Sequence, residues 1–329
     1  MKRYILLCLL IAITCCCNAQ VIKGKVIDSA SGKPIAGANI YLNGTYKGTT
    51  SNNEGMFTIN SAEVNTPLMV SYIGYEAQSV FNYAGKDLII ALKPKSIILR
   101  EVTIGADAMG REAEMKIFLT EFIGSASKDC VISNPDDIYF TYHKSSQLLT
   151  AGADKPLIIY NKKLGYKITY FLGSFTNQVN ATTYDGDFFF TEDTAGLQPK
   201  QLKKILKARD EAYFGSQMHF IRALWADKLK QEGFELDDHK SYQDIITTRL
   251  GQKFIALTVI IGQGQKSLTF AGPLNITYKG RSSFLKQQET NEETLIAPNG
   301  FYDNDLVWGG EMGGQRISQM LPFEFLPSK

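Results

Sequence analysis

The sequence predicts a mostly β protein, α+β overall, in which an N-terminal β-sandwich precedes an α+β domain. Short apolar segments alternate with turn residues from position 23 to position 92, without any helical period. Helical periodicity begins only after position 113, and the helices there are grouped rather than alternating with the strands. The 329 residues are enough for two domains of ordinary size.

Seven short strands are predicted in the first part, separated by turn signals. Asn43-Gly44 is a dipeptide favoured in tight hairpins, because both positions adopt positive φ there. Asn52-Asn53-Glu54-Gly55 is predicted to be a second turn, because Asn and Gly are favoured in turns. Short strands at this spacing are typical of a β-sandwich. The predicted strands are residues 23–27, 38–42, 45–49, 56–59, 68–72, 78–81 and 88–92.

Two segments of this part carry a family resemblance. GKVIDSASGKPIAGANIYLNGTYKGTTSNNEGMFTI and LMVSYIGYEAQSV are similar to the carboxypeptidase regulatory-like domain, over residues 21–94. The resemblance implies a transthyretin-like sandwich of the kind found in Bacteroidota envelope proteins, and it implies no peptidase activity in the module. The features that carry it are Gly24, Gly32-Lys33-Pro34, Gly37-Ala38, Gly55, Phe57 and Ser71-Tyr72-Ile73-Gly74-Tyr75.

Residues 95–113 are predicted to be a linker. Modules of this family commonly precede a TonB-dependent outer-membrane receptor, and residues 99–104 resemble the segment that leads into its plug. About 215 residues follow, whereas 22 strands of about ten residues need about 220 before any loop is counted. An eight-stranded barrel would conflict with the helical segments described next. We therefore expect a protein that is not a transmembrane barrel.

Residues 114–329 are predicted to form the α+β domain. Residues 114–126 show the apolar stripe of an amphipathic helix. Residues 199–231 are helical with an interruption at Gly215-Ser216, where Ser216 is placed to cap the second helix and Gly233 to end it. The segments AYFGSQMHFIRALW, ADKPLIIYNKKLGY and GGQRISQMLPFEF resemble an uncharacterised region of Bacteroidota secreted proteins, which implies no activity. Predicted strands are residues 138–143, 157–160, 166–171, 181–184, 188–191, 254–261, 268–270 and 274–278.

The N-terminus predicts export. Basic Lys2-Arg3, an apolar segment and Cys17-Asn18-Ala19 form a signal peptide at residues 1–19, with cleavage leaving Gln20 first. The alternative is a lipoprotein acylated on one of the three cysteines at positions 15–17. Either route predicts a periplasmic or outer-membrane-associated protein. Cleavage leaves Cys130 alone in the mature chain, as a small buried hydrophobe.

The charge composition argues against one class of partner, nucleic acid, and does not identify a partner. A net charge of +2 from 35 basic and 33 acidic residues provides no field that would attract nucleic acid. An envelope protein or a glycan remains a candidate partner.

No catalytic motif is found. Zinc carboxypeptidases take two ligands from His-x-x-Glu, and none of His143, His219 and His239 has a glutamate three residues on. There is no Gly-x-Ser-x-Gly elbow and no P-loop. We predict no metal and no cofactor. Whether the chain is an enzyme stays open, and the missing motifs favour a protein without catalytic activity.

One helical face is a candidate binding patch. His219, Arg222 and Trp225 are spaced by three residues, so they share a face on which Trp225 could stack and Arg222 could act as a clamp. The alternative is core packing of Trp225 with Met218, Ile221 and Leu224. Asp185-Gly186-Asp187 is interpreted as a hairpin tip rather than an acid–base pair.

The function predicted from the sequence is a non-enzymatic accessory, binding or scaffolding protein of the bacterial cell envelope. The alternatives are a hydrolase with its site in residues 114–329 and a glycan-binding module.

Overall fold

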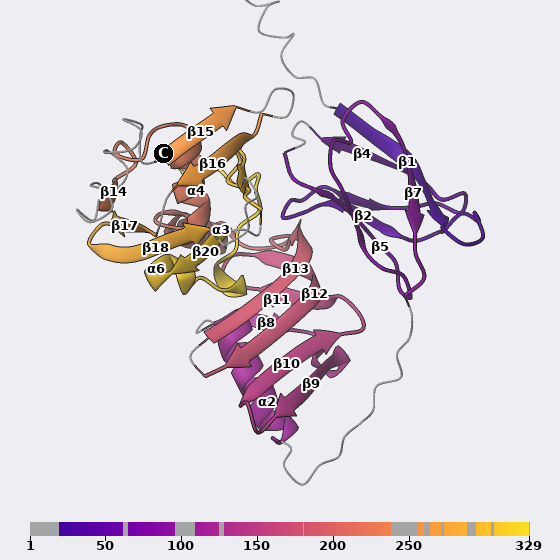
Figure 1. Ribbon diagram of the computed structural model, residues 1–329, viewed down its shortest axis with the longest axis horizontal. Coiled ribbons are helices and arrows are strands. Elements are labelled where there is room, and N and C mark those ends of the chain that lie inside the picture. Colours follow the sequence, from indigo (N-terminus) through magenta and orange to yellow (C-terminus); the bar gives the residue numbers. More distant parts are fainter. Residues whose placement is uncertain are drawn as a thin grey trace, which may run out of the picture. The chain divides into compact units, whose positions relative to one another are not determined.

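The computed structural model contains two compact units (Figure 1). The first comprises Met1–Asn43 and Lys47–Leu99, and the second comprises Gly44–Tyr46 and Arg100–Lys329. The predicted signal peptide and most of the predicted linker lie outside the described residues. The structure describes residues 20–61, 65–95, 109–124, 128–179, 181–237, 255–259, 264–270, 273–287, 294–303 and 306–328.

The first unit is built from two sheets with strand orders β4-β1-β7 and β3-β2-β5-β6. β1 and β7 pair in parallel, and the other neighbours are antiparallel. Every strand predicted for this part has a counterpart, although the third begins at Gly48 and not at Thr45. The strands are β1 (Gln20–Asp28), β2 (Asn39–Leu42), β3 (Gly48–Thr50), β4 (Met56–Ser61), β5 (Leu68–Ser71), β6 (Gln78–Val80) and β7 (Asp87–Leu92).

Alternation of side chains builds the core of this unit. β4 alternates exposed and buried residues, so that Phe57 and Ile59 point inward. A Cβ on Gly24 would lie 2.5 Å from the carbonyl oxygen of Leu88, so glycine permits the close approach of β1 and β7. The core side chains include Ile22, Val26, Ile40, Leu42, Phe57, Ile59, Leu68, Val70 and Ile90.

The turn after β1 is held by the carboxylate of Asp28. Its Oδ1 accepts hydrogen bonds from the main-chain N–H groups of Ala30 and Ser31 and from the Ser31 hydroxyl, and Tyr75 donates its hydroxyl to Oδ2 at 2.7 Å. These bonds, led by the Ser31 N–H, lower the pKa of Asp28 to about 2.

A six-stranded sheet forms the first part of the second unit. The early part of β12 pairs with β11, its later part pairs with β10, and β13 runs along its other edge. β13 is continuous where two separate strands were predicted, so Asp185 and Asp187 lie inside a strand and the hairpin-tip interpretation is wrong. The strands are β8 (Cys130–Ile132), β9 (Ile138–His143), β10 (Leu148–Ala153), β11 (Leu157–Asn161), β12 (Tyr166–Gln178) and β13 (Ala181–Glu192).

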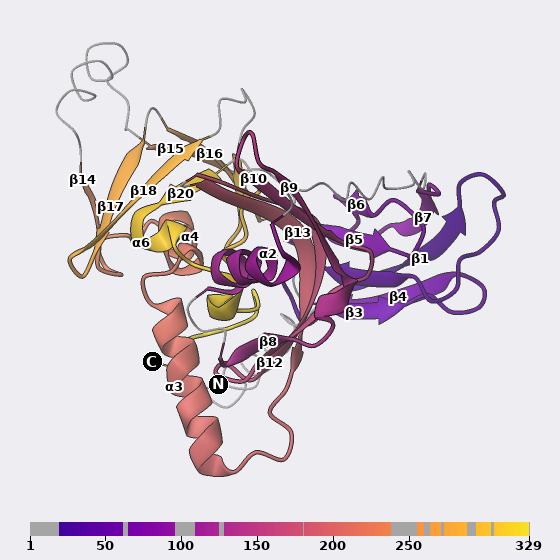
Figure 2. The ribbon, with the colours of Figure 1, turned by 90° about the horizontal axis from the view of Figure 1, so that it is seen from below.

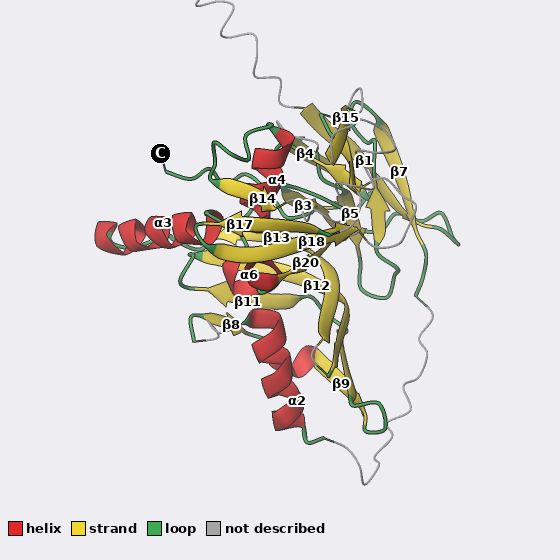
Figure 3. Cartoon of the chain, turned by 60° about the vertical axis from the view of Figure 1, so that its left-hand side comes forward, coloured by secondary structure: helices red, strands yellow, loops and turns green. Residues whose placement is uncertain are grey.

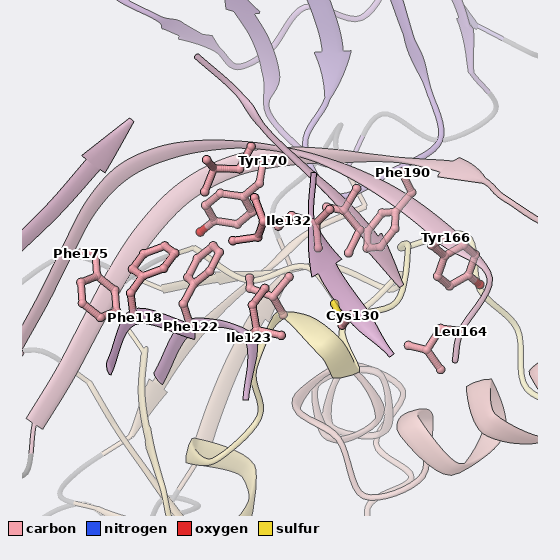
Figure 4. Close-up of a cluster of buried hydrophobic side chains, with 14 of the residues drawn as sticks. Phe118, Phe122, Ile123, Cys130, Ile132, Leu164, Tyr166, Tyr170, Phe175 and Phe190 are labelled. Atoms are coloured by element: carbon pink, nitrogen blue, oxygen red, sulfur yellow. The ribbon is translucent and has the colours of Figure 1, made fainter. Parts of the chain in front are cut away.

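Helix α2 (Arg111–Phe118), continued by a π-helical turn (Leu119–Ile123), packs against this sheet. The ring of Phe118 lies 4.8 Å from that of Phe175, and Phe122 lies 5.0 Å from Tyr170, between ring centroids (Figure 4). Cys130 is buried in the same core, as predicted.

A second core lies between helix α4 (Gln217–Trp225) and two small sheets. Phe220, Ile221 and Leu224 of α4 are buried against them. The Ser216 hydroxyl accepts a hydrogen bond from the His219 N–H, which is the predicted cap, but α4 ends at Trp225 and not near residue 231. The sheets contain β14 (Phe234–Asp237), β17 (Leu274–Tyr278), β18 (Arg281–Gln287) and β20 (Leu306–Gly309), and β15 (Ile255–Val259), β16 (Lys266–Phe270) and β19 (Thr294–Ile296).

The predicted fold class is confirmed, because strands dominate, helices are grouped and the N-terminal part is a sandwich. The described part also contains the α-helices α3 (Pro199–Tyr213) and α6 (Gly310–Gly313) and two 3-10 helices, Pro135–Asp137 and Ile317–Gln319. No helix in the described ranges has the length and apolar character required to cross a bilayer.

Candidate functional site

Helix α3 projects from the other elements of the second unit (Figures 2 and 3). Ile205, Ala208, Arg209 and Tyr213 are its buried residues. The opposite side of its N-terminal half is basic. Lys200, Lys203, Lys204 and Lys207 are exposed there, within an arc of about 100° at 3.6 residues per turn.

The charges of α3 are arranged against its dipole. A helix favours acidic residues in its first turn and basic residues in its last. The first turn of α3 has no acidic residue and the last turn has no basic one, whereas Lys200 lies near the start and Glu211 near the end. The helix dipole therefore does not favour Lys200 at its position.

Arg209 fastens α3 to the sheet. Its Nε donates to the carbonyl oxygen of Leu164 at 2.8 Å, and its guanidinium also bonds to the carbonyl oxygen of Gly165 at 3.3 Å and to the Glu192 carboxylate at 2.6 Å. Its Cζ lies 4.0 Å from the centroid of the Tyr166 ring, and Arg209 is 8% exposed. The helix is thus positioned by a buried residue on the side away from its lysines.

The turn between β11 and β12 is also fixed by buried groups. The side chain of Asn161 accepts a hydrogen bond from the Leu164 N–H and donates one to the Ser318 carbonyl. Gly165 has a φ of +65°, and a Cβ there would lie 2.7 Å from the Thr194 side chain. Lys162 and Lys163 are therefore presented by a rigid turn.

This turn and α3 line one groove with a volume of about 710 Å³. We call it the lysine groove, after Lys162, Lys163, Lys204 and Lys207. Its acidic side chains are Asp129, Asp193 and Glu211, its amide is Gln201, and its apolar lining is Ala195, Leu197, Ile205 and Ala208.

Most charges of the lysine groove are not matched to one another. Lys207 Nζ lies 3.7 Å from Glu211 Oε1. Among the residues that the structure describes, no ion pair engages Lys162, Lys163 or Lys204. Three ammonium groups are consequently available to a ligand.

A second groove of about 700 Å³ lies along another part of α3. Here Arg281 pairs with Glu311 at 3.0 Å, and Lys279 Nζ lies 5.3 Å from the centroid of the Tyr278 ring. Phe214, 42% exposed, is its main apolar side chain. Its cations thus have partners within the protein.

His219, from the predicted binding patch, is buried among aromatic rings. Its Nδ1 accepts a hydrogen bond from the Gly215 N–H, so Nε2 carries the proton and donates to Glu232 at 3.2 Å. Burial lowers the pKa of His219, while the Glu232 carboxylate opposes that shift. The surrounding rings are Tyr213, Phe214, Phe234 and Tyr278.

Arg222 and Trp225 have separate surroundings on α4. The Arg222 guanidinium donates to the carbonyl oxygens of Asn299, Phe323 and Phe325. Lys266 Nζ lies 4.5 Å from the Trp225 ring centroid and donates to the Trp225 carbonyl. The three residues share one helix, and their role as a binding patch stays a prediction.

The other two histidines, His143 and His239, add no residue to a candidate site in the described part of the chain. His143 ends β9, and His239 lies outside the described residues. Within the described part of the chain, no three His, Cys, Asp or Glu residues are grouped so that they could hold a metal ion.

The lysine groove was missed by the sequence analysis. The spacing of lysines at positions 200, 203, 204 and 207 was visible and marks one helical face. What no local pattern revealed is that Lys162 and Lys163, some forty residues earlier, line the same groove as Lys204 and Lys207.

Comparison with known proteins identifies the first unit. Residues 22–104 match the model of the CarboxypepD_reg-like domain. The resemblance found in the sequence is therefore confirmed, and the chain carries a domain of this class.

The relatives are TonB-dependent receptors. Receptor P26 of Formosa agariphila is 31% identical over 118 residues, covering 36% of this chain and 11% of the receptor. SusC of Bacteroides thetaiotaomicron is 37% identical over 83 residues, covering 25% and 8%, and receptor P39 of Formosa agariphila is 33% identical over 87 residues, covering 26% and 8%. The aligned parts span about a tenth of the length of these relatives.

Proposed function

We propose that this protein is a non-catalytic accessory or binding protein of the bacterial envelope. The observation that supports it is the match of its first unit to a regulatory-like domain that TonB-dependent receptors also carry. The second unit supplies the binding surface, for which the lysine groove is the leading site.

The proposed location is outside the inner membrane, in the periplasm or associated with the outer membrane. The basic and apolar order of residues 1–19 supports export, and the receptor relatives support an envelope setting. A lipid anchor on one of the cysteines at positions 15–17 is the alternative mode of attachment.

Fractionation of a Bacteroidota host that expresses the chain with a C-terminal tag tests this proposal. We expect the tagged chain in the envelope fraction, with mass spectrometry finding an unacylated N-terminus at Gln20. The control replaces Leu6 and Leu9 by Arg, which breaks the apolar segment and should retain the chain in the cytoplasm.

Three outcomes bear on the proposal in different ways. A cytoplasmic wild-type chain that still begins at Met1 would overturn the envelope proposal. A diacylglyceryl cysteine would overturn only cleavage after Ala19. Turnover of a peptide or glycan by the purified chain, abolished by one substitution in residues 114–329, would favour the hydrolase instead.

A further inference from the structure

We infer that the lysine groove binds an anionic polysaccharide, a chain whose sugar units carry carboxylate or sulfate groups. This inference rests on the proposed binding function and names its ligand class. It starts from the cations that Lys162, Lys163 and Lys204 present without a carboxylate partner among the described residues.

The groove is not explained by folding. Lys162, Lys163 and Lys204 are exposed and make no ion pair among the described residues, so they contribute little to the stability of the fold. Arg209 and Asn161, which are buried, do the positioning of the two lysine-bearing elements. The exposed lysines of the groove are therefore available to bind a ligand.

The lining suits a sugar chain with spaced charges. Lysine ammonium groups bind carboxylates and sulfates as point charges. Between them, the carboxylates of Asp129 and Asp193 and the amide of Gln201 can accept hydrogen bonds from sugar hydroxyls. Ala195, which is exposed, and Leu197, which is half-buried, offer apolar contact to the C–H faces of the rings.

The same lining disfavours other polyanions. Asp129 and Asp193 would repel the closely spaced phosphates of a nucleic acid, and no aromatic side chain lines the groove to stack a base. A lipid surface is flat, whereas these lysines line a concave site. The net charge of +2 also provides little long-range attraction to a dense polyanion.

The test measures binding of oligogalacturonate by isothermal titration calorimetry with the full chain. Its fully methyl-esterified form has the same backbone without the charges and is the matched probe. We expect the charged form to bind, the ester not to bind, and added salt to weaken binding.

A quadruple variant locates the site. Lys162→Gln, Lys163→Gln, Lys204→Gln and Lys207→Gln together should weaken binding on the order of thirtyfold, as the loss of four exposed charge contacts predicts. The control removes the same charge from exposed lysines of the first unit, by Lys33→Gln, Lys86→Gln, Lys93→Gln and Lys95→Gln, and should retain the affinity. Replacing the four groove lysines by Arg keeps the positive charges and should retain most of the affinity.

Several results would overturn the inference. Equal losses in the groove variant and the control would show non-specific attraction, and equal binding of the ester would show that charge is not recognised. Tighter, groove-dependent binding of single-stranded DNA or of phosphatidylglycerol vesicles would assign the groove to those ligands. None of these results changes where the protein fractionates, so the envelope proposal is judged separately.

Discussion

The guanidinium group of Arg209 lies over the ring of Tyr166, with Cζ 4.0 Å from the ring centroid. The same group bonds to the Leu164 carbonyl and to the Glu192 carboxylate. One buried side chain therefore joins α3 to the start of β12 and the end of β13. The position of the lysine groove depends on this junction.

Replacing Arg209 by Met should lower the free energy of unfolding of the second unit by about 2–4 kcal/mol, because buried carbonyl groups lose their donor. Arg209→Lys should retain only part of this free energy, since an ammonium group lacks the planar set of donors of a guanidinium group. Both tryptophans, Trp225 and Trp308, lie in the second unit, so their fluorescence during urea unfolding reports on it. Lys203→Met, on the exposed side of α3, is the control and should change stability by less than about 0.5 kcal/mol. A loss no larger than the control's would contradict the prediction.

His219 should titrate below 6.5, because burial favours its neutral form. The folded state then binds fewer protons than the unfolded state, so this contribution to stability is present above pH 6.5 and is lost as the pH falls through 6.5 toward the folded pKa. NMR titration of the imidazole, assigned with His219→Gln, measures the pKa.

The partner of His219 provides a second test of this arrangement. Glu232→Gln removes the carboxylate that favours the cation and should lower the pKa of His219 further. A higher pKa in this variant would show that the contact with Glu232 is misassigned.

Asp28 should make the first unit sensitive to acid. Its pKa of about 2 is below the usual 3.8, so its charged form contributes stability above pH 3.8, and that contribution is lost as the pH falls toward 2. Calorimetry should find wild type more stable than Asp28→Asn near neutral pH, with the difference narrowing in acid. Tyr75→Phe removes one hydrogen-bond donor to Asp28, so its stability should lie between those of wild type and Asp28→Asn. A difference that does not change with pH would contradict this assignment.

Residues 21–94 should fold alone. They contain the seven strands, except for Gln20 at the start of β1, and the buried core of the first unit. Limited proteolysis should cut between residues 93 and 111 and leave two resistant fragments, identified by mass spectrometry. If the isolated module lacks a cooperative thermal transition, or if cleavage there is no faster than elsewhere, the predicted domain boundaries fail.

The sandwich was predictable because its signals are local. Asn43-Gly44 and Gly55 stand at reversals of the chain, and the segments between them have the length and composition of strands. In the second unit, strands with weak local signals were missed, even where they pair with the adjacent strand in sequence, as β10 does with β9 and β18 with β17. β10 contains Ala-Gly-Ala and β18 begins with Arg-Ser-Ser, so neither has a strong strand preference of its own.

The candidate site was predictable only in part, because its residues come from segments that are distant in sequence. A lysine face can be recognised from its spacing along α3, but its meeting with Lys162 and Lys163 follows from the strand pairing of β11 with β12 and from the contacts of Arg209. The residues picked from the sequence, His219, Arg222 and Trp225, were selected by helical spacing alone. That spacing does not distinguish an exposed face from one enclosed by later segments of the chain.

The separation of tasks around α3 has an evolutionary consequence. Arg209 holds the helix from its buried side, while the lysines of the groove point outward and contribute little to holding it. Substitutions at the outward positions can therefore accumulate without loss of the folded state. Related chains would be free to exchange these lysines for acidic, aromatic or neutral side chains and so acquire new ligand preferences on an unchanged backbone.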